Sequence, residues 1–210
     1  AVQEAAARRG LRVVDATCPD VAKTHELVRK LVAEGYEILY VGKRNHPEPE
    51  GVIGEAPEHV YLVEKEEDLD GLPAETKERL EAAPVAVTTQ TTLSQWDTIR
   101  IIAAIRQRYP DAEIHNEICR ATQTRQEAAV EAAREVELVL VVGDQCSNNS
   151  NRLVQVVREI AGKPAYLIDG VDDIRPEWLQ GVKRVAVTSG SSTPSQITRA
   201  VIEHLRRWES

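Results

Sequence analysis

The sequence predicts an α/β fold with parallel sheets, divided into two similar units of about 100 residues each. Short runs rich in Val, Ile and Leu alternate with helical runs of about 10–15 residues, which is typical of repeated βαβ units. The strand-like runs are apolar throughout, and this favours strands that are buried on both faces of a sheet. We expect the boundary between the units near residues 116–120, where a short strand ends and a long helix begins.

In the first half, the helical runs have clear start and stop signals. Pro19 opens the first amphipathic run and Gly35 ends it, because Pro suits the first helical turn and Gly the C-terminal cap. The long helical run that follows Leu93 stops before Pro110. We expect strands at 11–16, 36–41, 60–63, 84–88 and 113–115, and helices at 19–34, 66–72 and 93–108.

The second half repeats this alternation with a buried strand between two helical runs. The run 137–142 (ELVLVV) is apolar almost throughout and predicts a buried strand. We expect strands at 137–142, 165–168 and 185–188, and helices at 121–135, 151–161, 174–179 and 195–208.

Composition excludes several classes of protein. The chain has 210 residues, 26 of them basic and 34 acidic, and its net charge of −8 argues against a general nucleic-acid binder. With 42% hydrophobic and 29% charged residues it matches an ordinary soluble globular protein. No apolar run approaches the roughly 18–20 residues of a membrane span, so we expect neither a nucleic-acid nor a membrane partner.

Three predicted strands run directly into turns that are rich in Ser, Thr, Asn and Gln and that open a helix. The carboxyl ends of parallel strands are where α/β folds bind ligands, and helix N-termini there attract anions. Three such turns around one cleft predict a phosphate or diphosphate site, although helix capping favours the same residue types and stays the alternative. The chain lacks both the P-loop and the G-x-G-x-x-G motif, which disfavours an ATPase or a dinucleotide enzyme. The turns are residues 88–94, 143–151 and 188–194.

A fourth turn holds a candidate proton donor. His46 and Glu48 flank Pro47 after the strand that ends at Val41. A His and a Glu in one rigid turn can act as proton donor and relay, and the alternative is a solvated loop that carries charges.

The cysteines point to metal chemistry or to incidental thiols. Cys18, Cys119 and Cys146 are an odd number without a C-x-x-C pair, which disfavours a disulfide framework and excludes a local zinc knuckle. Cys18 and Cys119 each open a helix in an equivalent place of their unit, where the helix N-terminus favours the thiolate. This arrangement suits a cluster held between two units better than a single nucleophile.

Five motifs in a fixed order resemble the LytB, or IspH, family of 4-hydroxy-3-methylbut-2-enyl diphosphate reductases. They are spread over nearly the whole chain, so together they are far more specific than any one of them. The motifs are DATCP at 15–19, HPEPEG at 46–51, TQTTLS at 89–94, ICRATQTRQE at 118–127 and SNNSNRL at 147–153.

The resemblance implies a cytoplasmic oxidoreductase that acts in isoprenoid biosynthesis. In the family a [4Fe–4S] cluster delivers two electrons, the allylic hydroxyl leaves as water, and isopentenyl and dimethylallyl diphosphates form. A ferredoxin or flavodoxin supplies the electrons. By matched motif, Cys18 and Cys119 would be cluster ligands and Glu48 the proton donor or relay. The residues expected to bind the allylic diphosphate are His46, Thr91, Ser147, Asn148, Asn149 and Ser192.

The sequence also departs from the family pattern. Family members have three α/β domains in a trefoil-like arrangement, and the first cluster cysteine lies in a Gly-Phe-Cys segment that this chain does not contain. We therefore expect residues 1–17 to end a first α/β domain, and residues 18–117 and 118–210 to be the second and third. We expect the chain alone to bind a cluster poorly. Cys146 occupies a position that is usually polar and is not expected to be a ligand, and Asn45 replaces a Gly before His46.

Two other functions stay open. One is a non-enzymatic α/β module that binds a diphosphate and lacks the cluster. The other is a thiol hydrolase that uses Cys18 with His25, although seven residues along a helix separate the two by ~10 Å.

Overall fold

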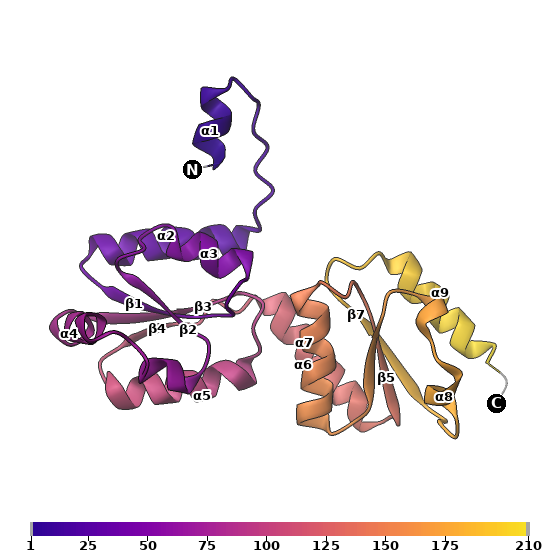
Figure 1. Ribbon diagram of the computed structural model, residues 1–210. Coiled ribbons are helices and arrows are strands. Elements are labelled where there is room, and N and C mark those ends of the chain that lie inside the picture. The colour runs from indigo at the N-terminus through magenta and orange to yellow at the C-terminus, as the bar shows by residue number, and fades with distance from the viewer. Residues whose placement is uncertain (1, 209–210) are drawn as a thin grey trace.

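The computed structural model describes residues 2–208 and contains two parallel sheets, as the sequence predicts. The first sheet has the strand order β2-β1-β3-β4 and the second the order β6-β5-β7. Figure 1 shows the two units side by side, each with helices on both faces of its sheet. The first unit comprises α2 (Pro19–Ala33), β1 (Glu37–Val41), α3 (Pro47–Ile53), β2 (Val60–Val63), η1 (Glu66–Leu69), α4 (Ala74–Ala82), β3 (Val85–Thr89), α5 (Gln95–Arg108) and β4 (Glu113–His115).

The second unit repeats the topology of the first. β5 pairs with β6 and β7 in the way that β1 pairs with β2 and β3, and the equivalent strands β3 and β7 have nearly the same sequence. The internal repeat predicted from the strand–turn–helix segments is therefore also a repeat of topology. The second unit comprises α6 (Arg120–Arg134), β5 (Leu138–Val142), α7 (Asn148–Val156), η2 (Val157–Ala161), β6 (Ala165–Ile168), η3 (Val171–Asp173), α8 (Pro176–Leu179), β7 (Val185–Ser189) and α9 (Ser195–Arg206).

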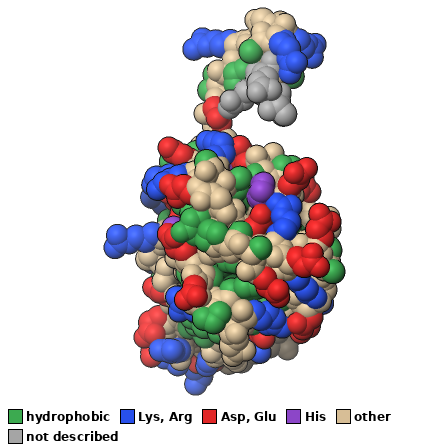
Figure 2. Space-filling model, turned by 90° about the vertical axis from the view of Figure 1, so that its left-hand side faces the viewer, with side chains coloured by type: hydrophobic (Ala, Val, Ile, Leu, Met, Phe, Trp, Pro, Cys, Tyr) green, Lys and Arg blue, Asp and Glu red, His purple; other side chains and the backbone are tan. Residues whose placement is uncertain are grey.

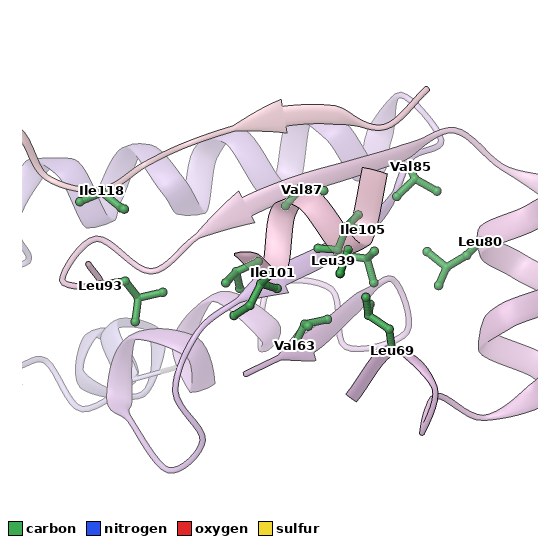
Figure 3. Close-up of a cluster of buried hydrophobic side chains, with 12 residues drawn as sticks. Leu39, Val63, Leu69, Leu80, Val85, Val87, Leu93, Ile101, Ile105 and Ile118 are labelled. Carbon is green, nitrogen blue, oxygen red and sulfur yellow. The ribbon is translucent and has the colours of Figure 1, made fainter. Parts of the chain in front are cut away.

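Each sheet is covered by helices on both faces, and this explains why its strands are continuous apolar runs. On one face of the first sheet, Leu39 and Val87 pack against Ile101 and Ile105 of α5 (Figure 3). On the opposite face, a second cluster packs α2 and α3 against β1. The second sheet has the same two-sided arrangement, with α6 and α7 on one face and α8 and α9 on the other.

The expected strand at 11–16 is wrong. This segment has no regular secondary structure, and Leu11 and Val14 are 56% and 79% exposed. An apolar run becomes a strand only when a neighbouring strand pairs with it, and this segment lies away from both sheets together with α1 (Val2–Arg8) (Figures 1 and 2). Figure 2 also shows that acidic and basic side chains are mixed over the visible face of the first unit.

Two helix predictions also need correction. The helix expected at 66–72 is a short 3₁₀ turn, η1, and it is followed by α4, which the sequence pattern did not predict. α4 buries only Thr76 and Leu80, so its sequence carries almost no apolar periodicity. The helix expected at 151–161 begins three residues earlier, at Asn148. No helix within residues 2–208 is both long and apolar enough to cross a membrane.

The buried carboxylate of Glu37 stabilises the first sheet at the edge where its strands begin. Glu37, at the start of β1, accepts a hydrogen bond from the Tyr61 hydroxyl (2.8 Å) and pairs with Arg79 (2.9 Å) and with His59 Nδ1 (3.0 Å). Burial alone would raise the pKa of Glu37, but hydrogen bonds from Tyr61, His59 and Arg79 outweigh it and hold the pKa below its ordinary value.

We predict that Glu37→Gln lowers the free energy of unfolding at neutral pH by about 2 kcal/mol, because it removes hydrogen bonds to a charged group. Since the folded-state pKa is lowered, the carboxylate stabilises the fold above the ordinary pKa of 4.5, and this contribution disappears as the pH falls through the lowered value. Urea unfolding of both proteins over this pH range measures the difference. Glu34→Gln, which removes an exposed partner of Lys30, is the control. Equal stability of the wild type and Glu37→Gln at neutral pH would contradict the prediction.

Candidate functional site

The site is built around Glu48, which lies in the first turn of α3 at the carboxyl edge of the first sheet. The Glu48 side chain is buried at 9% exposure. One carboxylate oxygen accepts the backbone N–H of Thr91 (2.6 Å), and the other accepts the Thr91 hydroxyl (3.1 Å). The fully buried Tyr40 hydroxyl lies beside the same carboxylate, without the geometry of a regular hydrogen bond.

The surroundings of Glu48 change its pKa. Burial raises the pKa of Glu48, while the hydrogen bonds from Thr91 and the nearby His46 oppose the rise without cancelling it. Burial and the neighbouring Glu48 carboxylate also raise the pKa of Tyr40. A carboxyl group that holds its proton closer to neutral pH is suited to act as a general acid.

The turn before α3 is shaped by Asn45 and His46. Asn45 has a φ of 58°, a left-handed conformation that Gly adopts freely and that Asn tolerates better than most residues. Asn45 therefore adopts the backbone conformation that is expected of a Gly at this place. His46 caps the helix, because its Nδ1 accepts the backbone N–H of Glu48 (3.2 Å). The capping bond fixes the imidazole next to Glu48.

Thr91 also connects this turn to the second unit. Its carbonyl oxygen accepts the backbone N–H of Cys119 (2.8 Å), so one residue contacts both the carboxyl group and the cysteine turn. The Thr89 hydroxyl, two residues earlier, accepts the N–H of Glu117 (2.9 Å). The loop that joins the two units is therefore tied to the end of β3.

Cys18 and Cys119 occupy equivalent positions and lie near each other. Each is the N-cap of a long helix, and their backbone angles are nearly the same, with φ −55° and ψ 133° for Cys18 and φ −57° and ψ 126° for Cys119. Both thiols are free. The Cys119 thiol lies close enough to the carboxylate of Asp20, two residues after Cys18, to lower the pKa of Asp20.

A second group of polar residues lies at the carboxyl edge of the second sheet, at the start of α7. Ser147 caps this helix by accepting the N–H of Ser150 (3.3 Å). Asn149 is buried and donates to the Ser191 hydroxyl (3.3 Å), which leaves its Oδ1 without a partner in the described part of the chain. Ser192, the neighbour of Ser191 in the loop before α9, is exposed.

Two glycines make room for this turn. A Cβ atom on Gly143 or Gly190 would collide with the hydroxyl of Ser150, which is 1% exposed. The two glycines end the β5 and β7 segments, so the start of α7 packs directly on the backbone of both strand ends. Backbone N–H groups and small polar side chains are thus gathered at the start of α7, and a helix N-terminus of this kind favours anions.

Asn148 joins the two groups of residues. Its side-chain amide donates to the Thr92 hydroxyl (3.0 Å), which also accepts from Gln90 (3.0 Å). Gln90 is fully buried and accepts the N–H of Lys43 (2.9 Å) with its other end. The turns after β1, β3 and β5 are therefore linked by hydrogen bonds. Of the three predicted turns, residues 88–94 and 143–151 are joined by Asn148 and Thr92, and Asn149 joins 143–151 to 188–194 through Ser191.

Some candidates lie apart from this network, and some members were not predicted. Cys146 is exposed and bonds locally, its N–H donating to Asp144 (2.6 Å). His25, a possible partner of Cys18, instead pairs with Glu55 (2.7 Å). Within residues 2–208 no group of three or more His, Cys, Asp or Glu side chains is placed to hold a metal ion. The sequence did not single out Tyr40 or Gln90 as site residues, because Tyr40 lies in an apolar strand run and Gln90 in a polar turn.

The comparison with protein families identifies the chain. The family model described as LytB protein matches residues 1–206. The chain belongs to the LytB family. Among curated members, the 4-hydroxy-3-methylbut-2-enyl diphosphate reductase of Symbiobacterium thermophilum is 57% identical over 99% of this chain. That of Exiguobacterium sp. (strain ATCC BAA-1283 / AT1b) is 53% identical over the same share.

The solved structures of relatives agree with the fold of this LytB chain. The E-1-hydroxy-2-methyl-but-2-enyl-4-diphosphate reductase from Plasmodium falciparum superposes with a TM-score of 0.92 at 34% identity, over 98% of this chain and 64% of its own. A second structure, described as the terminal enzyme of the non-mevalonate pathway, gives a TM-score of 0.63 at 33% identity, over 99% and 72%. The chain spans 69% and 64% of the lengths of the two curated relatives named above.

We predict that Thr91→Val raises the pKa of Glu48 above that of the wild type, because it removes the hydroxyl that stabilises the carboxylate. Carboxyl-selective ¹³C NMR titration measures this pKa directly. Thr92→Val is the matched control, since the Thr92 hydroxyl contacts Gln90 and Asn148 and leaves Glu48 untouched. A Glu48 pKa that is the same in the wild type and Thr91→Val would show that this hydrogen bond does not control the carboxyl group.

Proposed function

We propose that the intact protein reduces 4-hydroxy-3-methylbut-2-enyl diphosphate to isopentenyl and dimethylallyl diphosphates. The reaction breaks the allylic C–O bond, consumes two electrons and two protons, and releases the hydroxyl oxygen as water. The observation that carries the proposal is the position of Thr91, which contacts the buried Glu48 carboxyl and the Cys119 turn at the same time. Family membership and the reductase names of the curated relatives support the same assignment.

The thiols of this chain fit part of a [4Fe–4S] site. Cys18 and Cys119 are free and occupy the same position at two helix N-termini, and the Cys119 thiol lies beside Asp20, two residues after Cys18. We propose that both bind the cluster, as thiolates at helix N-termini are suited to do. A bound cluster supplies electrons and a Lewis-acidic iron for the departing hydroxyl.

Glu48 is proposed to hold the proton that the leaving hydroxyl needs. Its raised pKa keeps the carboxyl protonated closer to neutral pH, and Thr91 fixes both of its oxygens. His46 lies next to it as the cap of α3 and is placed to relay a proton.

The start of α7 is proposed to bind the diphosphate. Ser147 and Asn149 present a hydroxyl and an amide at a helix N-terminus, and Asn148 connects this turn to Thr92. Ser192 completes the set from the loop before α9, and Thr91 contributes from the loop before α5. A ferredoxin or flavodoxin type of donor in the cytoplasm is the proposed source of electrons.

Anaerobic reconstitution with iron and sulfide tests the proposal and its alternative. In the intact protein we expect bound iron and acid-labile sulfide to fall to background in Cys119→Ser and to remain at the wild-type level in Cys146→Ser, because Cys119 lies at the site and Cys146 does not. Turnover with a chemically reduced electron carrier, measured on the same samples, should follow the iron content.

Each of the other outcomes contradicts a part of the proposal. Loss of iron in Cys146→Ser would show that Cys146 is the ligand. Binding of inorganic pyrophosphate by an intact wild-type protein that takes up no iron would favour the non-enzymatic diphosphate-binding module.

A further inference from the structure

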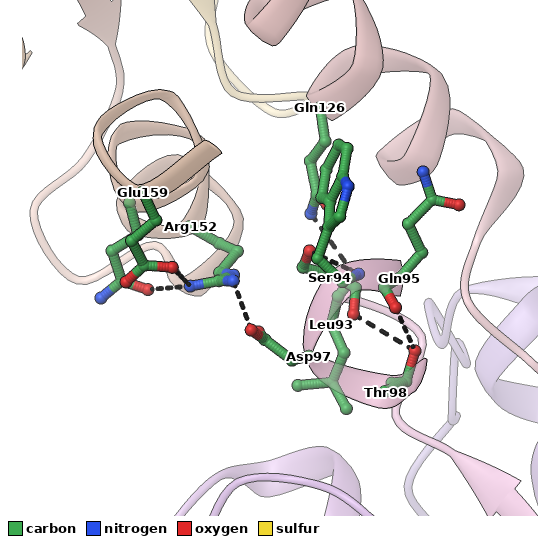
Figure 4. Close-up of polar contacts among 10 residues, drawn as sticks. Leu93, Ser94, Gln95, Asp97, Thr98, Gln126, Arg152 and Glu159 are labelled. Carbon is green, nitrogen blue, oxygen red and sulfur yellow. Dashed lines mark hydrogen bonds and ion pairs between the residues drawn. The ribbon is translucent and has the colours of Figure 1, made fainter. Parts of the chain in front are cut away.

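A buried arginine connects the two units beside the proposed site. Arg152 lies on α7 and is 5% exposed, although it carries a charge that normally seeks water. Its Nη2 pairs with Asp97 Oδ1 at 2.6 Å, and Asp97 belongs to α5 of the other unit (Figure 4). Its Nη1 bonds to Gln155 (2.9 Å) and to Glu159 (3.3 Å), both in its own unit.

The position of this pair relates directly to the two functional turns. Arg152 follows Asn149 by three residues, so it lies about one helical turn beyond the proposed diphosphate-binding residues. Asp97 is in the first turn of α5, and the loop before that helix contains Thr91 and Thr92. Each partner is thus rigidly attached through less than two turns of helix to one of the two turns that form the site.

The geometry allows little freedom. A guanidinium group is a planar fork, and here its two terminal nitrogens are bonded to side chains from both units. The remaining Nε is buried and has no partner within the described residues, so no further bond can compensate if the group rotates. The other link between these turns, from Asn148 to Thr92, is a hydrogen bond between neutral groups and is weaker than a charged pair.

We propose that Arg152 and Asp97 are a positioning pair that holds the diphosphate-binding turn of α7 at a fixed distance from the Thr91–Thr92 turn. This inference rests on the proposed function of the α7 turn. Neither side chain is a catalytic residue, because each acts through the helix that carries it. Breaking the pair leaves each turn intact within its own unit and weakens the coupling between them to what the bond from Asn148 to Thr92 provides.

The test follows inorganic pyrophosphate binding to the full chain by NMR of backbone amides. In the wild type we expect pyrophosphate to shift the amides of both turns, residues 147–150 and residues 90–92. In Arg152→Met and in Asp97→Asn we expect the shifts at 147–150 to remain and those at 90–92 to be strongly reduced, because the bond from Asn148 to Thr92 is the weaker link. The double variant should behave like either single variant, because the two residues act as one unit. Arg152→Lys, which keeps the charge, should retain part of the response.

The controls separate the possible failures. Arg108→Met and Asp70→Asn break a pair of similar type (2.5 Å) inside the first unit and should leave both sets of shifts unchanged. Circular dichroism checks that every variant is folded, and Arg152→Lys provides a milder change where Arg152→Met is unfolded. A wild type that binds no pyrophosphate would overturn the proposed function of the α7 turn. A wild type that binds it with shifts at 147–150 alone, or variants that keep the shifts at 90–92, would overturn the positioning pair.

Discussion

The double contact between Thr91 and Glu48 is the interaction on which the rest of the site depends. The backbone N–H and the hydroxyl of one residue bind both oxygens of one buried carboxyl group, and the carbonyl of the same residue receives the N–H of Cys119. A change in the backbone at Thr91 would therefore move the candidate proton donor and a candidate cluster ligand together. Thr91 thus sets the separation between the Glu48 carboxyl group and the Cys119 turn.

The fold explains why this residue can serve both units. Parallel strands end at one edge of a sheet, so the turns after β1 and β3 lie together, and β3 also receives the loop that leads to the second unit. The second unit repeats the first and brings its own helix N-termini to the same place. The proposed site, with two cysteines, a carboxyl group and a turn at a helix N-terminus, is thereby built from loops on two rigid sheets.

Much of the fold could be predicted from the sequence, because continuous apolar strands and amphipathic helices follow directly from burial on both faces. The pattern of apolar residues cannot show whether a strand finds a partner, and this is why the expected strand at 11–16 is wrong. It also misses α4, whose charged sequence buries only two side chains. The motif order indicated Glu48, Thr91 and the α7 turn. Contacts that depend on how the two units meet, such as Arg152 with Asp97 and Tyr40 beside Glu48, required the structure.

The central claim is that the start of α7 and the Thr91 turn belong to one site. A crystal structure of the chain with inorganic pyrophosphate tests it most directly. The account predicts phosphate oxygens within hydrogen-bond reach of Ser147 and Asn149, on the side of α7 that faces Thr92. Pyrophosphate bound only elsewhere, for example in the hollow of about 680 Å³ beside Leu80 and Tyr109 at the opposite edge of the first sheet, would contradict it.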